Sequence, residues 1–153
     1  MSEPAIGAPA PDFDLETADG RVRLGDFAGR TLALYFYPKD DTSGCTREAQ
    51  DFTALAGDFA KAGISVVGVS KDSIAAHRKF ATKYDLSVTL ASDPEGAAIA
   101  RYGSWVEKSL YGRKYMGIDR STFLIRNGAI ERIWRKVKVA NHAQQVLDAA
   151  RSG

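Results

Sequence analysis

Three apolar runs in the sequence predict β-strands. Residues 31–37 and 64–70 are almost continuously apolar, which is typical of strands covered on both faces. Residues 86–91 form a shorter run of the same kind. The three runs therefore predict the buried centre of a β-sheet.

The segments between these runs have helical periodicity, because their apolar residues recur at spacings of three and four. One helix ends at Gly63, a second extends from residue 72 or 73 through 84, and a short one covers 94–102. A last helix begins near Asn141. The apolar faces of the first and last helices consist of Ala49, Phe52, Leu55, Ala56 and Phe59, and of Ala143, Val146, Leu147 and Ala150.

Turn residues predict two hairpins. Residues 13–17 and 21–24 flank an Ala-Asp-Gly turn, and residues 119–125 and 129–134 flank Asn127-Gly128, a strong hairpin signal. We expect an irregular lead-in over residues 1–12. We also expect a long loop over residues 104–117, whose aromatic residues are Trp105, Tyr111 and Tyr115.

The order of these elements defines the fold class. Strands alternate with helices in the middle of the chain, and a hairpin and a final helix follow. This order predicts an α/β protein with a central mixed β-sheet flanked by helices on both faces. It matches a thioredoxin-like fold with an N-terminal β-hairpin extension, formed as a single domain by residues 1–153.

Composition narrows the function classes. Of 153 residues, 44% are hydrophobic and 26% charged, and the net charge is only +2. That balance predicts no nucleic-acid partner and no membrane partner. The N-terminal residues lack a signal-peptide pattern, and no apolar stretch reaches the ~20 residues of a membrane span. With a free thiol, these features predict a cytoplasmic protein.

Potential metal ligands are few. Cys45 is the only cysteine, which excludes an intrachain disulfide and a cysteine-rich zinc site. The two histidines, His77 and His142, lie far apart in the chain without a carboxylate at metal-binding spacing. We therefore expect no metal and no cofactor, and we expect both histidines to be ordinary surface or helix-face residues.

The surroundings of Cys45 indicate a reactive thiol. A strand leads into Pro38, and the thiol follows Thr42 and Gly44 where a helix is expected to begin. Unpaired N–H groups at a helix start stabilise a thiolate. Acyl transfer usually requires a histidine, and disulfide exchange of the thioredoxin type requires Cys-x-x-Cys. Attack on a peroxide requires neither, only a thiolate, hydrogen-bond donors and a collinear approach.

Residues 35–48 resemble the Pro-x-x-x-Thr-x-x-Cys motif of the peroxiredoxins, and most closely that of the bacterioferritin comigratory protein (BCP, PrxQ) branch. Residues 111–125 resemble the Gly-Ile-x-Arg-Ser-Thr-Phe strand of the same branch, and residues 134–139 also resemble it. The resemblance extends over about residues 5 to 150. It implies a thioredoxin-like domain of the AhpC/TSA type.

The resemblance also implies a role for each site residue. Cys45 would be the peroxidatic nucleophile that becomes a sulfenic acid, and the hydroxyl of Thr42 would orient the peroxide. Arg120 would stabilise the thiolate and the negative charge of the transition state. Pro38 would shield the pocket from water, and the backbone N–H groups of Gly44 and Cys45 would bind the substrate.

Members of the branch often have a second cysteine, which this chain lacks. The two positions where such a resolving cysteine often occurs hold Gln50 and, on the next helix, approximately Ala81. We therefore expect a one-cysteine enzyme without a resolving cysteine, reduced by an outside thiol such as thioredoxin, glutaredoxin or glutathione. Glu48, one turn beyond Cys45, is interpreted as a partner for an arginine or as a capping group, not as a base.

These residues predict a peroxidase that reduces hydrogen peroxide and organic hydroperoxides in antioxidant defence, as a monomer or weak homodimer. An alternative is a thioredoxin-like peroxide sensor or binding module, whose cysteine is oxidised without efficient turnover. The missing second cysteine favours that alternative. A cysteine-dependent hydrolase is a third interpretation, which predicts ester or peptide cleavage that is insensitive to peroxide.

Overall fold

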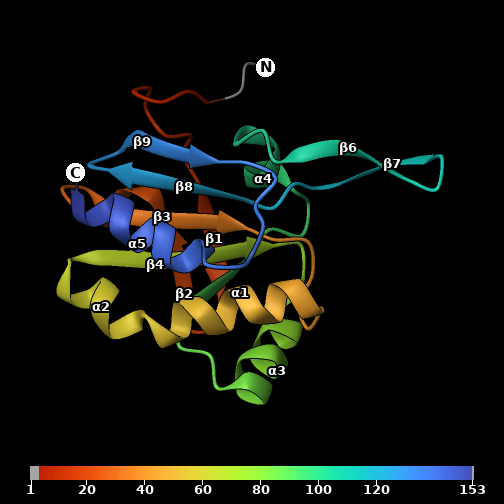
Figure 1. The fold of residues 1–153 in the computed structure, drawn as a ribbon, viewed down its shortest axis with the longest axis horizontal. Helices are drawn as coiled ribbons and strands as arrows, with labels where there is room; N and C mark the ends of the chain where they lie inside the picture. The colour runs from red at the N-terminus through yellow and green to blue at the C-terminus, as the bar shows by residue number, and fades with distance from the viewer. Residues whose placement is uncertain (1–3, 153) are drawn as a thin grey trace.

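The computed structural model describes residues 4–152. Its centre is a seven-stranded sheet with the order β2-β1-β5-β4-β3-β8-β9, and a separate two-stranded ribbon, β6-β7, projects from one side (Figure 1). The strands are β1 Asp14–Thr17, β2 Gly20–Arg23, β3 Thr31–Phe36, β4 Ile64–Ser70, β5 Thr89–Ser92, β6 Trp105–Leu110, β7 Arg113–Ile118, β8 Ser121–Arg126 and β9 Ala129–Trp134. The sheet is mixed, since β3, β4 and β5 are parallel while β8, β9 and β1 run antiparallel to their neighbours.

Helices cover both faces of the sheet. One core cluster joins Tyr35 of β3 to α1, α2, α3 and α5, and the opposite cluster joins Phe36 of β3 to α4 and to the N-terminal hairpin. Every residue of β3 is buried, as its continuous apolar run predicts. The helices are the 3-10 turn η1 Leu24–Phe27 and the α-helices α1 Ser43–Ala54, α2 Ala56–Lys61, α3 Ile74–Tyr84, α4 Ala97–Arg101 and α5 His142–Ser152.

The expected α/β class, the central mixed sheet flanked by helices and the N-terminal hairpin extension are confirmed. The Asn127-Gly128 hairpin is also confirmed, with both residues at positive φ. Several boundaries differ from expectation. The short helix expected over residues 94–102 is α4 Ala97–Arg101, and the strand expected over residues 119–125 is β8 Ser121–Arg126. The helix that ends at Gly63 is interrupted at Leu55, two residues before the weak helix former Gly57, and the third central strand begins at Thr89 rather than at residue 86.

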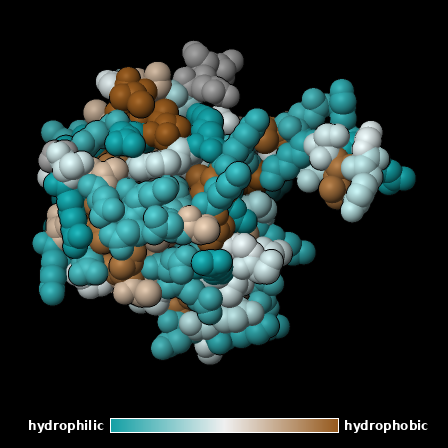
Figure 2. Space-filling model, viewed as in Figure 1, coloured by the Kyte–Doolittle hydropathy of each residue, from teal (hydrophilic) through white to brown (hydrophobic). Residues whose placement is uncertain are grey.

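The predicted loop over residues 104–117 is wrong, because these residues form the β6-β7 ribbon. Tyr111 and Gly112 both have positive φ and make its tight turn. Most of its side chains are exposed, so the alternation of buried and exposed residues that marks a strand is weak here. Figure 2 shows the ribbon standing away from the body of the molecule, with a small hydrophobic patch near its end.

Candidate active site

Cys45 and Arg120 meet because of the register between β3 and β8. Phe36, the last residue of β3, pairs with Ser121, the first residue of β8. The loop that leads to Cys45 and the residue that precedes β8 therefore lie at the same edge of the sheet. There Arg120 Nη2 donates a hydrogen bond of 3.2 Å to Cys45 Sγ, across 75 positions of the chain.

Cys45 lies in the first turn of α1, which begins at Ser43 after the N-cap Thr42. The cysteine is buried, with 2% of its surface exposed. Thr46 N–H donates to the carbonyl of Thr42 and closes the first turn. The sulfur therefore lies at a helix start, where backbone N–H groups and the helix dipole favour negative charge.

Glu48 holds the guanidinium of Arg120 in place. Arg120 Nη1 donates to Glu48 Oε1 at 2.6 Å, and the exposed fractions of the two side chains are 17% and 1%. Burial raises the pKa of Glu48 to about 7, although the charge and hydrogen bond of Arg120 act in the opposite direction. Within residues 4–152, Glu48 Oε2 has no hydrogen-bond partner. The expected pairing of Glu48 with an arginine is confirmed.

Gly44 permits the close approach of Arg120 to the sulfur. A Cβ atom at this position would lie 3.1 Å from Arg120 Nη2 and 3.7 Å from its Cζ. A side chain here would therefore push the guanidinium away from its place beside Cys45. Glycine at this position thus leaves room for the guanidinium of Arg120, which the sequence motif alone does not show.

Thr42 and Pro38 lie in the segment between β3 and α1, three and seven residues before Cys45. Thr42 is exposed, and its hydroxyl donates to the carbonyl of Lys39 at 2.8 Å and makes no capping hydrogen bond. The hydroxyl proton of Thr42 is thus engaged, and the orientation of a peroxide by this hydroxyl stays a prediction. Pro38 is exposed in the loop that follows β3, and its shielding of the pocket stays a prediction.

Sequence reasoning missed a buried network beneath the loop. His77 was expected to be an ordinary surface or helix-face residue, but it is buried on α3, and its Nδ1 lies 2.6 Å from Asp40 Oδ2. Tyr37 donates to Asp40 Oδ1 at 2.6 Å, and His77 Nε2 lies 3.0 Å from the carbonyl of Ala91. The network fixes the path of the chain between Tyr37 and Asp40. No local sequence signal marks it, because its members come from three separate segments.

His142, which was expected to be an ordinary surface or helix-face residue, is also buried, at the start of α5. Its Nε2 lies 2.8 Å from Thr122 Oγ1, and its ring packs against Phe52 and Trp134. Burial, assisted by the charge of Arg120, lowers the pKa of His142 to about 4. A neutral imidazole is thus maintained behind the site. No described hydrogen bond joins either histidine to Cys45, so the structure supports no histidine-assisted acyl transfer.

The described residues hold no cluster of three potential metal ligands, and none of their helices is long and apolar enough to cross a membrane. Gln50 lies exposed on α1, and Ala81 is half-buried on α3. The site therefore offers one buried sulfur and a guanidinium held against it. This pair can stabilise a thiolate and a negative charge that develops beside it.

Known proteins are similar to this chain over nearly its whole length. The AhpC/TSA family model matches residues 6–133. Peroxiredoxin Bcp of Bacillus subtilis is 44% identical over 144 residues, which cover 93% of this chain and 92% of the relative. Peroxiredoxin Bcp of Xanthomonas campestris is 42% identical over 156 residues, which cover 99% of this chain and 98% of the relative.

Solved structures agree with these relatives. A structure of a PrxQ cysteine-to-serine variant from Xylella fastidiosa has a TM-score of 0.93 at 34% identity. The match covers 99% of this chain and 98% of the Xylella fastidiosa chain. The Xanthomonas campestris bacterioferritin comigratory protein has a TM-score of 0.90 at 40% identity, with 98% of each chain covered. The thioredoxin-like fold is thus confirmed. This chain belongs to the AhpC/TSA family, in its peroxiredoxin Bcp (PrxQ) branch, and is a thiol-dependent peroxidase.

Proposed function

We propose that Cys45 reduces hydrogen peroxide and organic hydroperoxides in a one-cysteine cycle. The observation that carries this proposal is the 3.2 Å contact between Arg120 Nη2 and Cys45 Sγ, with the guanidinium held by Glu48 from the same helix as the sulfur. A positive charge fixed at this place stabilises the thiolate before reaction and the negative charge that moves onto the oxygens during it.

The chemical step is a displacement at oxygen. The thiolate of Cys45 attacks the terminal oxygen of the hydroperoxide, the O–O bond breaks, and the leaving oxygen takes up a proton to become water or an alcohol. Cys45 is left as a sulfenic acid. Thr42 Oγ1 accepts the substrate O–H, and Arg120 and the N–H groups of Gly44 and Cys45 donate to the oxygens. Holding the thiolate in line with the O–O bond accounts for much of the rate acceleration.

An outside thiol completes the cycle, because Cys45 is the only sulfur nucleophile of the chain and neither Gln50 nor Ala81 replaces a resolving cysteine. The electron donor is thioredoxin, glutaredoxin or glutathione. For the Xanthomonas campestris protein an alkyl peroxide reduction activity is described, which supports organic hydroperoxides as substrates. We extend the proposal to a monomer or weak homodimer in the cytoplasm, where thiols stay reduced.

Rapid mixing of the reduced protein with hydrogen peroxide tests the role of Arg120. We expect Arg120→Met to lower the second-order rate of Cys45 oxidation by about 10²- to 10³-fold, as for loss of one strong donor to a developing anion. Arg47→Met is the matched control, because Arg47 is an exposed arginine on α1, the helix that carries Cys45, and its Nε lies 3.9 Å from Asp51 Oδ2. Equal rates in wild type and Arg120→Met would refute the proposed role.

A peroxide sensor is the second candidate function, which the missing second cysteine favours. Steady-state assays of peroxide consumption with thioredoxin, glutaredoxin or glutathione distinguish an enzyme from a sensor. An enzyme consumes peroxide continuously and loses this activity in Cys45→Ser. A sensor stops after one equivalent with every donor.

A further inference from the structure

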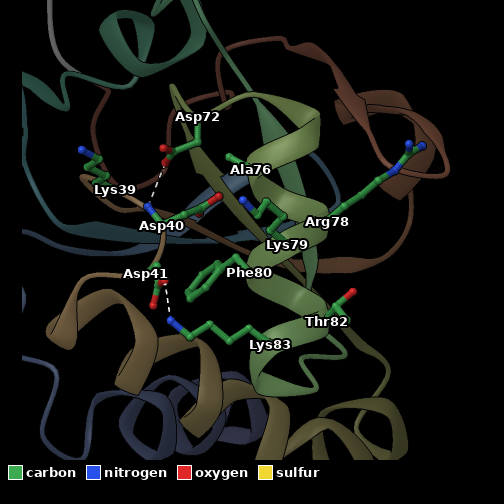
Figure 3. A pocket seen from close by; sticks show the side chains of 10 residues that line it. All are labelled: Lys39, Asp40, Asp41, Asp72, Ala76, Arg78, Lys79, Phe80, Thr82 and Lys83. Carbon is green, nitrogen blue, oxygen red and sulfur yellow. Dashed lines mark hydrogen bonds and ion pairs between the residues drawn. The ribbon is translucent and has the colours of Figure 1, made fainter.

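The loop between β3 and α1 is attached to α3 by a few polar contacts. A groove of about 730 Å³ lies between the loop and the helix, and its lining includes residues of both. Figure 3 shows Asp41 of the loop paired with Lys83 of α3, and the backbone N–H of Asp40 donating to Asp72, beyond the end of β4. Because the groove separates parts of the loop from the helix, these contacts decide where the loop lies.

The most deeply buried of these contacts joins Asp40 to His77 of α3. The two side chains are 5% and 1% exposed, and Asp40 Oδ2 lies 2.6 Å from His77 Nδ1. The hydroxyl of Tyr37 donates to Asp40 Oδ1 at 2.6 Å, so both carboxylate oxygens are engaged. With its backbone N–H bound to Asp72, Asp40 is held at its side chain and at its backbone.

Both ring nitrogens of His77 face hydrogen-bond acceptors. Nδ1 meets the carboxylate of Asp40, and Nε2 lies 3.0 Å from the carbonyl oxygen of Ala91 in β5. A neutral imidazole has a single N–H and would turn a lone pair toward one of these acceptors, whereas an imidazolium donates to both. The 2.6 Å bond from the Tyr37 hydroxyl to Asp40 has the length typical of an O–H donor on an ionised carboxylate. The geometry therefore indicates an imidazolium–carboxylate pair.

The fixed part of the loop leads directly into the turn that carries the sulfur. Asp41 follows Asp40 with a φ of 59°, a left-handed conformation that few residues other than glycine adopt, and donors on α3 hold its carboxylate. Thr42 is the N-cap of α1, and its carbonyl accepts the N–H of Thr46, which closes the turn that contains Cys45. A shift of Asp40 would therefore displace the backbone where this turn begins.

We propose that His77, as an imidazolium, is a positioning residue of the peroxidase reaction. Through Asp40 it holds the loop, and through the loop it holds the first turn of α1, so that Cys45 Sγ stays 3.2 Å from Arg120 Nη2. The inference rests on the function proposed above and adds a residue of another helix that acts at a distance from the sulfur. Because the thiolate and its donor are arranged before the peroxide arrives, a small displacement lowers the rate steeply.

The charge of His77 is tested by nitrogen NMR of the reduced protein with labelled histidines. At neutral pH we expect both ring nitrogens of His77 to carry protons. His142 is an internal reference with one N–H, because burial and the charge of Arg120 lower its pKa to about 4. Asp40→Asn should make the His77 ring neutral, because the amide then donates to Nδ1. A neutral His77 in the wild type would overturn the inference.

Positioning is tested by rapid mixing of each reduced variant with hydrogen peroxide. His77→Leu should lower the second-order rate of Cys45 oxidation about tenfold, because it removes the donor that holds Asp40. His77→Asn should recover most of that rate, since its amide nitrogen takes the place of Nδ1 and donates to Asp40. Tyr102→Phe is the control and should react like wild type. It also loses a hydrogen bond of 2.6 Å, to the carbonyl of Pro11, but in the core cluster on the other face of the sheet.

Circular dichroism establishes that each variant is folded at the assay temperature. Should His77→Leu not fold, Tyr37→Phe replaces it, because it removes the donor to the other oxygen of Asp40 and should also react more slowly than Tyr102→Phe. Wild-type rates in these variants, or His77→Asn as slow as His77→Leu, would contradict the positioning role. A slow reaction of the wild type itself would instead contradict the peroxidase function, so the two failures are distinguishable.

Discussion

Glu48→Gln tests the electrostatics of the site through the pH dependence of stability. The pKa of Glu48, ordinarily about 4.5, is about 7 in the folded protein, chiefly because of burial. Between these values the folded carboxyl keeps a proton that the unfolded chain releases. The contribution of Glu48 to the free energy of unfolding is therefore greatest below pH 4.5 and is lost as the pH rises to 7. At about 1.4 kcal/mol for each pKa unit, the loss amounts to about 3 kcal/mol.

His142 contributes a change of opposite sign. Its pKa falls from 6.5 to about 4, so the folded protein keeps a neutral ring that the unfolded chain would protonate. The stability that depends on His142 is present above pH 6.5 and is lost as the pH falls toward 4. In wild type the two changes largely cancel, and only a variant reveals either one.

The assay is urea denaturation of wild type and Glu48→Gln from pH 4.5 to 8.5 under reducing conditions. At pH 4.5 the protonated carboxyl and the amide are both neutral, so we expect equal stabilities. At pH 8 we expect the variant to be more stable by about 3 kcal/mol. Glu107→Gln, with an exposed carboxyl on β6, is the control and should show no such divergence. A variant less stable than wild type at pH 8 would refute the reasoning.

Three further substitutions test packing. Gly44→Ala should lower the rate of Cys45 oxidation by hydrogen peroxide about tenfold by displacing Arg120, while Gly57→Ala, which meets no atom within 4 Å, should not. Gly68→Ala would place a Cβ 2.5 Å from Tyr35 Cζ, so urea denaturation should show a loss of about 1–3 kcal/mol. Tyr35→Phe removes a buried hydroxyl that has no partner within residues 4–152 and should not lower thermal stability; a loss above about 1 kcal/mol would contradict this.

Local signals predicted most of the fold. The apolar run that became β3 is buried throughout, and Asn127-Gly128 makes the expected hairpin. The β6-β7 ribbon was missed because its turn has Tyr111 where Asn, Asp or Gly usually precedes the glycine, and because few of its side chains are buried. A strand without a buried face leaves little pattern in the sequence.

The sequence by itself determined the helix start that carries Cys45, the apolar strand before it and the absence of a second thiol. Tertiary structure decided which distant groups surround that sulfur. The pairing of β3 with β8 brings Arg120 to Cys45, and the docking of α3 buries His77 against Asp40 and leaves the groove beside the loop. Periodicity and turn residues report only interactions between near neighbours in the chain. Contacts across 37 or 75 positions depend on register and helix docking, which no local pattern encodes.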